Sequence, residues 1–294
     1  MTVLDAASVN VLFHQPKPDG SYDGNARMHL RELGKKRPCV LLAFPPKAAG
    51  TYFRTAVIAA VGGQLVRVVH AQGGRDATPY LPTFVNYFNG GVSERTLVSH
   101  IHMQALPANI NFLESFGIRP IIMTRSIPDM LASYWDMLMK DPKAMQDGLN
   151  CRIPPNFRQM PDTQKGDFMI DIMGPWYASY FATWLEYADD APDQVCVLDY
   201  SEFTDDPAGT LMRAVAHVGL PRSREECEKA LGIVWERRDQ YRYNKGETGR
   251  SARYFAPAQI ARLARMLDFY PNLKSHRDTL LGVGGVAMPL AAAG

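Results

Sequence analysis

The residues best suited to chemistry lie between positions 44 and 53, where the chain reads Phe-Pro-Pro-Lys-Ala-Ala-Gly-Thr-Tyr-Phe. An apolar run at 39–44 leads into this segment, and a helical pattern at 54–61 follows it. A strand, a tight turn and a helix start gather unpaired backbone N–H groups and the positive helix end, an arrangement that binds anions. Lys47 stands before Gly50, whereas the loop of nucleotide triphosphatases carries its lysine after the last glycine. This order predicts a loop that holds phosphate but does not hydrolyse ATP.

A second cation follows another expected strand, because Arg125 comes directly after the apolar run at 120–124. Its guanidinium offers a phosphate a planar fork of donors. Ser126 and Asp129 are typical of a helix cap and predict a helix at 128–140. Ser133 lies two turns inside that helix and adds a hydroxyl group. Together with the first loop, this site would hold a ligand that carries two phosphates.

A third basic segment spans 243–255 and reads Tyr-Asn-Lys-Gly-Glu-Thr-Gly-Arg-Ser-Ala-Arg-Tyr-Phe. Two glycines, two arginines and a lysine favour a loop that closes over phosphate. Between the first and second segments, His100 and His102 lie two apart on an expected strand, so both side chains point to one face.

The elements that must position these residues alternate along the chain. Strands are expected at 39–44, 65–69, 96–101, 120–124 and 195–199. Helices are expected at 54–61, 109–116, 128–140, 176–187, 208–218, 224–231 and 258–268. This alternation predicts an α/β fold with a central, mostly parallel sheet flanked by helices. The segments 71–95 and 141–174 are rich in Pro, Gly and polar or aromatic residues and are expected to be long loops, which are often functional lids.

Composition excludes several classes of function. The 294 residues are 46% hydrophobic and 21% charged with a net charge of +2, so no broad basic field argues for nucleic acid. The four cysteines lack the spacing of metal ligands, and no metal is expected. The chain has neither a run of about 20 apolar residues nor a basic and apolar leader at its start. We therefore expect a soluble cytoplasmic protein without a membrane span.

Five segments, in order, resemble the sulfotransferases that use 3′-phosphoadenosine 5′-phosphosulfate (PAPS). Cytosolic members of that family show PKSGTTW after the first strand, then KTHLP, RNPKDVxxSY, a Tyr-Glu-Asp segment and RKGxxGDWKNHF. The matching segments here are 46–53, 98–102, 125–134, 199–202 and 244–255. The stretch 174–184 also resembles the family's GSWxxHVxxWW helix. The likeness covers roughly residues 38–256.

The resemblance implies a P-loop-like three-layer α/β fold and a sulfotransferase domain at 38–278. A segment at 1–37 would precede this domain, and an apolar tail at 279–294 would follow it. The co-substrate would be PAPS, and the product adenosine 3′,5′-bisphosphate (PAP).

The resemblance also assigns roles to single residues. Lys47 would hold the 5′-phosphosulfate and act in catalysis, with Gly50 and Thr51 beside it. The other residues of this loop assigned to the donor are Ala48, Ala49, Tyr52 and Phe53. Phe53 stands where the family's tryptophan stacks on adenine, if the loop here is one residue longer.

The 3′-phosphate would be held by Arg125 and Ser133, whose separation of eight positions equals the family's spacing. Tyr200 would border the adenine, and Lys245 with Gly246 would complete the 3′-phosphate loop. Counting back seven residues from Pro107, as in the family's segment, selects His100 as the general base, with His102 as the runner-up.

Two positions depart from the family pattern. Val98 replaces a lysine, which removes a cation near the transferring sulfuryl group, and Asn244 replaces an arginine of the 3′-phosphate clamp. Arg242 and Arg250 are the nearby cations that could compensate.

The function implied is in-line transfer of a sulfuryl group to an acceptor hydroxyl or amine, with a histidine base. The acceptor is left open between a small molecule, such as a phenol or steroid-like alcohol, and a saccharide or lipid; the oligomeric state is also open. The aromatic residues that could line an apolar or sugar-stacking acceptor pocket are Tyr80, Phe84, Tyr87, Phe88 and Trp135. One alternative is a catalytically silent protein that binds PAP, motivated by Val98 and Asn244. Another is a nucleotide or sugar kinase on the same scaffold, against which the place of Lys47 argues.

Overall fold

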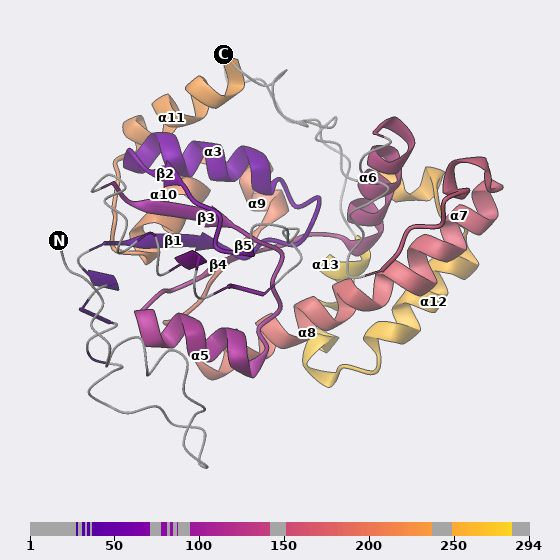
Figure 1. Ribbon diagram of the computed structural model, residues 1–294. Coiled ribbons are helices and arrows are strands. Elements are labelled where there is room, and N and C mark those ends of the chain that lie inside the picture. The colour runs from indigo at the N-terminus through magenta and orange to yellow at the C-terminus, as the bar shows by residue number, and fades with distance from the viewer. Residues whose placement is uncertain are drawn as a thin grey trace, which may run out of the picture.

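Five parallel strands form the centre of the molecule (Figure 1). The computed structural model describes residues 28, 31–32, 34–35, 37–70, 78–80, 83–84, 87, 95–141, 151–236 and 249–283. The strands are β1 (Cys39–Leu42), β2 (Gln64–Leu65), β3 (Leu97–His100), β4 (Ile121–Thr124) and β5 (Cys196–Asp199). They lie side by side in the order β2-β3-β1-β4-β5, and every pairing is parallel. The expected α/β class is confirmed, and within the described residues the sheet is wholly parallel.

Helices cover both faces of this sheet and extend beyond one end of it. The helices of the described residues are α3 (Gly50–Val61), α5 (Pro107–Phe116), α6 (Ile127–Lys140), α7 (Asp162–Phe168), α8 (Gly174–Asp190), α9 (Tyr200–Asp205), α10 (Pro207–His217), α11 (Arg224–Glu236), α12 (Pro257–Leu267) and α13 (Arg277–Leu281). Helices α3, α10 and α11 pack together on one face, while α5 and the carboxyl end of α8 lie on the other (Figure 1). The result is the three-layer arrangement that the sequence predicts.

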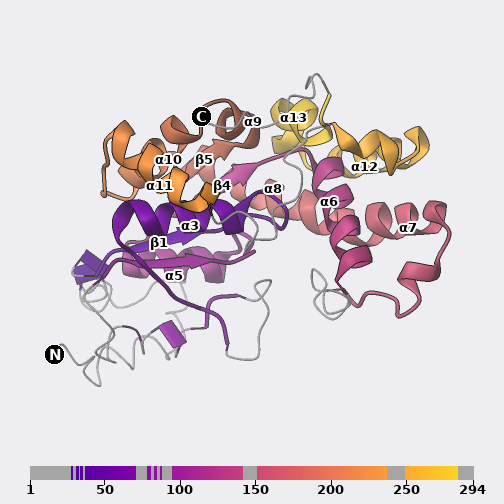
Figure 2. The same cartoon turned by 90° about the horizontal axis from the view of Figure 1, so that it is seen from above.

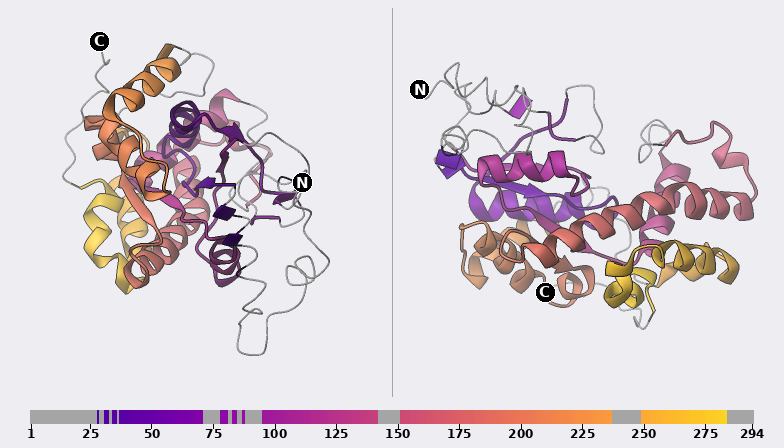
Figure 3. Two further views of the ribbon diagram at one scale, coloured as in Figure 1. Left: turned by 90° about the vertical axis from the view of Figure 1, so that its left-hand side faces the viewer. Right: turned by 90° about the horizontal axis from the view of Figure 1, so that it is seen from below.

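A second group of helices extends the molecule beyond one end of the sheet. Helices α6, α7, α12 and α13 lie there beside the amino half of α8, as Figure 2 shows from above. A π-helical turn (Met169–Met173) joins α7 directly to α8. Seen from below in Figure 3, α8 runs from the sheet layer out to this group. One long helix therefore connects the sheet to the helical group.

Local sequence signals explain where several helices begin. The Ser126 hydroxyl accepts a hydrogen bond from the Asp129 amide at 3.3 Å and caps α6, as predicted. Asp199 caps α9 through the Ser201 amide at 2.8 Å. Helix α5 begins at Pro107, where a missing N–H costs nothing because first-turn amides have no partner within the helix.

The structure corrects some of the expected elements. Residues 162–173, expected to lie in a long loop, form α7 and the π-helical turn, whose inner face is buried through Met169, Ile170 and Met173. The strand expected at 65–69 is only Gln64–Leu65. In the run at 66–69, Val66, Val68 and Val69 are buried and Arg67 is exposed, and Val66 still donates to the Val98 carbonyl at 2.9 Å. The hydrophobic pattern beyond Val66 therefore reports burial and not a continued strand. Helix α13 spans Arg277–Leu281, with Leu280 and Leu281 buried, and the domain boundary at 278/279 stays a prediction.

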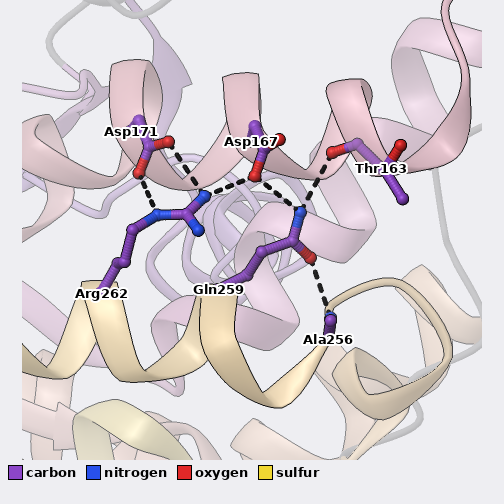
Figure 4. A network of polar contacts seen from close by, with 6 residues as sticks. All are labelled: Thr163, Asp167, Asp171, Ala256, Gln259 and Arg262. Carbon is purple, nitrogen blue, oxygen red and sulfur yellow. Dashed lines mark hydrogen bonds and ion pairs between the residues drawn. The ribbon is translucent and has the colours of Figure 1, made fainter.

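Polar contacts join α12 to α7 and the π-helical turn (Figure 4). The Gln259 side-chain amide donates to the Thr163 carbonyl and to Asp167 Oδ1, both at 3.0 Å. Arg262 pairs with Asp167 and, through Nε at 2.9 Å and Nη2 at 3.0 Å, with Asp171. These contacts fix the helix that follows the third basic segment of the sequence.

This network predicts a pH effect on stability. Hydrogen bonds from Gln259 and then Arg262 hold the pKa of Asp167 below its ordinary value. A carboxyl group whose pKa is lowered by folding stabilises the fold above its unfolded pKa, about 3.9, and this contribution disappears as the pH falls through the folded pKa. We expect Asp167→Asn to lower the melting temperature at pH 7 by roughly 1–3 °C, a small effect because the side chain is half-exposed and solvent screens its ion pair.

Thermal melts between pH 3 and 7 measure this effect, with the exposed Asp189→Asn as control. The difference between wild type and Asp167→Asn should shrink as the pH drops below about 4. A difference that stays constant across this range would contradict the proposed linkage.

Candidate functional site

The candidate site lies at the edge of the sheet where β1, β3, β4 and β5 end. Leu42 of β1 pairs with His100 of β3 and with Ile121 of β4, and Thr124 of β4 pairs with Asp199 of β5. Since all strands are parallel, the segments that follow them emerge at the same edge. Ligands of open α/β sheets bind outside the carboxyl ends of the strands.

The loop after β1 carries unusual backbone geometry. Lys47 (φ 68°) and Ala49 (φ 57°) are the non-glycine residues with positive φ in the part of the chain that is described. Such conformations cost on the order of 1–3 kcal/mol each and concentrate at binding and catalytic sites. Ala49 precedes α3 and offers no side-chain cap, so no side chain of its own competes for the amides of the first turn. The loop therefore has the geometry of an anion-binding turn.

Side chains from other elements hold the carbonyl groups of this loop. The Phe44 carbonyl accepts from His102 Nδ1 at 2.7 Å, and the Lys47 carbonyl accepts from Arg125 Nη1 at 2.5 Å. The Tyr180 hydroxyl donates to the Ala43 carbonyl, and the Tyr177 hydroxyl donates to the Pro46 carbonyl at 3.2 Å. Within the loop, the Pro45 carbonyl accepts from the Ala48 amide at 3.3 Å. Five consecutive carbonyl groups, residues 43–47, are thus each engaged.

Arg125 lies directly beside Lys47, as the hypothesis of a two-phosphate ligand requires. Besides its hydrogen bond to Lys47, the guanidinium stacks on Tyr200 at 3.9 Å from the ring centroid, a cation–π contact. Thr124 donates to Asp199 Oδ2 at 2.6 Å, which ties the end of β4 to the start of α9. Arg125, the backbone of Lys47 and the expected adenine neighbour Tyr200 therefore lie together.

Helix α6 brings the third segment to the same place. Asp129 is buried, and its carboxylate accepts from the amides of Gly249 at 2.8 Å and Ser251 at 3.1 Å. Two turns further on, Met137 Sδ lies 3.9 Å from Lys47 Nζ. Ser133 is buried on the same stripe of α6, four residues from each. This stripe thus faces both the first loop and the 249–254 segment.

The charge of Arg250 is paired with a carboxylate of α6. Arg250 forms an ion pair with Asp136 of α6 and donates to the Tyr254 hydroxyl at 3.1 Å, and that hydroxyl donates to Asp136 at 2.6 Å. The pairing neutralises the arginine that was expected to compensate for Asn244. Asn244, Arg242, Lys245 and Gly246 lie outside the described residues.

His100 packs onto the loop after β1, at Gly50. It is 6% exposed, and a Cβ added to Gly50 would lie 2.3 Å from both Cε1 and Nε2 of its ring. Only a glycine at position 50 allows this approach. The ring therefore lies against the first turn of α3, where the amides of the anion loop begin.

His102 is half-buried and stands edge-on to His100, with ring centroids 4.9 Å apart. The Phe44 carbonyl can only accept a hydrogen bond, so His102 Nδ1 carries the proton and its Nε2 keeps the lone pair in the neutral ring. This bond fixes the ring orientation of His102 and ties it to the loop after β1.

Other aromatic residues singled out by the sequence have different surroundings. Phe53 is fully buried between Phe44 and Phe203, at 5.3 Å from each ring, so its ring offers no surface to adenine in this structure. The cause is its place on the buried stripe of α3 with Ala56 and Val57. Tyr52 is partly exposed. Phe84, considered for an acceptor pocket, packs in the core.

Trp135 of the same group is also buried. Its ring lies between Phe157 and Tyr254 and carries Lys165 Nζ 5.9 Å above it. Tyr80 is 42% exposed, and Phe88 lies outside the described residues.

Sequence reasoning missed the hydrogen bonds made by helix α8. Tyr177, Tyr180 and Trp184 are fully buried, and the Trp184 indole donates to the Met103 carbonyl at 2.8 Å. The spacing Tyr-x-x-Tyr-x-x-x-Trp places the three on one helical face, which was the available signal. This spacing does not show that the polar atoms of the three side chains reach the loops after β1 and β3.

The parallel sheet, the anion loop after β1 and the cation after β4 define an α/β protein that binds an anionic ligand at the carboxyl edge of its sheet. The chain matches the family model described as "Sulfotransferase domain" over residues 85–265, more than half of its length. It therefore belongs to the sulfotransferase family, as the order of its motifs predicts.

The solved structure of a sulfotransferase agrees with this assignment at the level of the fold. Mouse sulfotransferase SULT7A1, described as complexed with PAP, matches with a TM-score of 0.58 and 14% identity, over 88% of this chain and 93% of its own. Retinol dehydratase, described as in complex with androsterone and inactive cofactor PAP, matches with a TM-score of 0.49 and 14% identity, over 88% of each chain. Comparison with curated proteins gives no match.

Two further findings apply to the described residues only. No helix among them is long and apolar enough to cross a membrane. They also contain no cluster of three or more His, Cys, Asp or Glu side chains arranged to hold a metal ion.

Proposed function

We propose that this member of the sulfotransferase family transfers a sulfuryl group from PAPS to an acceptor hydroxyl or amine and releases PAP. The contact between the Arg125 guanidinium and the Lys47 carbonyl carries the proposal, because it sets the cation expected at the 3′ end of the donor against the backbone of the loop expected at the 5′ end. Membership of the family and a fold shared with a PAP-bound sulfotransferase support it.

The donor would lie across the loop after β1. Lys47 and the amides of Ala49, Gly50 and Thr51 would hold the 5′-phosphosulfate, while the Ala48 amide donates to the Pro45 carbonyl within the loop. Arg125 and Ser133 would hold the 3′-phosphate, with Tyr200 beside the adenine and Lys245 and Gly246 completing the clamp. Phe53 has no exposed ring and is left out of this assignment.

The reaction would be an in-line displacement. The acceptor oxygen attacks sulfur, the bond from sulfur to the 5′-phosphate oxygen breaks, and the electron pair stays on PAP. Lys47 and the loop amides stabilise the charge that grows on this leaving oxygen. We assign the acceptor proton to His100, because its ring lies on the loop at Gly50 and is the imidazole packed against the amides of that turn.

One observation keeps the silent PAP-binding protein as a second candidate. Val98, where the family has lysine, is fully buried and pairs with Val40 and Leu65 in the sheet. An apolar side chain at this place leaves the transferring group with one cation fewer.

Calorimetry with PAP, followed by turnover of labelled PAPS with a panel of phenols, sterols and saccharides, tests the proposal. We expect binding and turnover by the wild type. Lys47→Met should weaken PAP binding about 10- to 100-fold, because it removes a hydrogen-bond donor to a charged group. The exposed Lys140→Met is the control and should bind as the wild type does. A wild type that does not bind PAP would refute the proposal, and binding without turnover of any acceptor would support the silent binder.

A further inference from the structure

Helix α8 reaches the donor loop through two tyrosine hydroxyls. Tyr177 donates to the Pro46 carbonyl at 3.2 Å, and Tyr180 donates to the Ala43 carbonyl three residues earlier. Both rings are fully buried. Burial also raises the pKa of the Tyr180 hydroxyl, so it remains a neutral donor. These bonds fix the two ends of the segment 43–46.

The bond at Pro46 determines where the next amide points. In a planar trans peptide the carbonyl and the following N–H point in opposite directions. Since the Pro46 carbonyl points to the Tyr177 hydroxyl, the Lys47 N–H points away from α8. Pro45 and Pro46 have no N–H of their own. The Lys47 amide is thus the first backbone donor of the turn.

The bond from Tyr177 to Pro46 also affects Lys47, whose backbone is strained. Lys47 has a φ of 68°, a conformation that an L-residue adopts only when its surroundings hold it there. Tyr177 fixes the peptide before Lys47, and Arg125 fixes the peptide after it. Without the bond from Tyr177, the peptide before Lys47 loses this support, while Arg125 still holds the peptide after it.

We propose that Tyr177 is a positioning residue for the 5′ end of the donor: its hydroxyl holds the Pro46–Lys47 peptide so that the Lys47 amide and side chain meet the 5′-phosphate. This inference rests on the proposed function. It assigns Tyr177 an effect on one end of the ligand only, because its hydroxyl donates to the peptide that precedes Lys47.

Tyr177→Phe removes the hydroxyl and keeps the buried ring. Tyr187→Phe is the matched control, since its hydroxyl lies on the same helix but contacts Glu114 Oε1 of α5, at 3.3 Å. Calorimetry measures the binding of PAP and of adenosine 3′-monophosphate, which lacks the 5′-phosphate. We expect Tyr177→Phe to weaken PAP binding about 10-fold and to leave the monophosphate within about 2-fold, since a hydrogen bond of this kind contributes roughly 1 kcal/mol or more. Tyr187→Phe should change neither.

Equal losses for both ligands would show that Tyr177 only supports the fold, and an unchanged PAP affinity would also overturn the inference. A wild type that binds neither nucleotide would instead refute the proposed function.

If Tyr177→Phe does not fold, the amide resonance of Lys47 in the wild type tests the same inference. The Lys47 amide resonance should shift when PAP is added and should not shift with the monophosphate. A Lys47 amide resonance that does not move with PAP would overturn the inference.

Discussion

Replacing Gly50 with alanine is expected to reduce turnover by about 100-fold or more and to destabilise the protein by about 1–3 kcal/mol. The new Cβ would lie 2.3 Å from two ring atoms of His100, a distance that Cβ atoms do not tolerate. Either the ring leaves the loop or the first turn of α3 moves, and displacements of about 1 Å in a catalytic site cost on the order of 100-fold. Overpacking a buried contact typically costs the stated free energy of unfolding. Melting curves and PAPS turnover measure the two effects.

The chain offers a matched control in Gly232 of α11, where an added Cβ would meet nothing within 4 Å. Gly232→Ala should raise the free energy of unfolding by about 0.4–1 kcal/mol and leave turnover unchanged. The double variant Gly50→Ala with His100→Ala should regain stability, because the clashing ring is absent, but not turnover. A Gly50→Ala protein with wild-type stability and activity would contradict the packing of His100 on the loop.

The main anchors of the site could be predicted because short-range rules determine them. Ser126 caps α6 as its type and its distance from Asp129 indicate, and Arg125 follows β4 at the predicted edge of the sheet. Parallel strands then bring Arg125 beside Lys47, although 78 residues separate them in the chain. Order of elements and strand direction suffice for this part of the result.

Contacts set by side-chain packing could not be predicted in the same way. Phe53 was expected at the adenine, but its place on α3 turns the ring toward Phe44 and Phe203. The pairing of Arg250 with Asp136 joins residues 114 positions apart, and no local pattern announces it. The tyrosines of α8 belong to the same class, because a buried aromatic stripe looks alike whether or not its hydroxyls reach a loop.

His100→Ala is expected to lower kcat by about 10²–10⁴-fold and to leave PAP affinity within about 3-fold of the wild type, the result for loss of a general base. The ring of His100 lies on Gly50 at the amides that would hold the 5′ end, so it is placed for the acceptor proton and not for the nucleotide. His102 is bound to the Phe44 carbonyl and stands edge-on to His100, so it should act by holding the loop and that ring. His102→Ala should therefore weaken PAP binding several-fold and reduce kcat less than His100→Ala does.

Separate measurements of kcat and of PAP affinity decide whether His100 or His102 is the general base. Calorimetry gives the PAP affinity, and turnover of the fastest acceptor in the panel gives kcat, with His276→Ala as a control outside the site. If the large loss of kcat falls on His102→Ala while His100→Ala weakens PAP binding, the base is His102, and its Nε2, which keeps the lone pair in the neutral ring, is the proton acceptor. If neither substitution changes kcat, no histidine of β3 or its continuation acts as the base. In that case the positive groups of the loop after β1 would have to carry the catalysis alone, through stabilisation of the leaving phosphate.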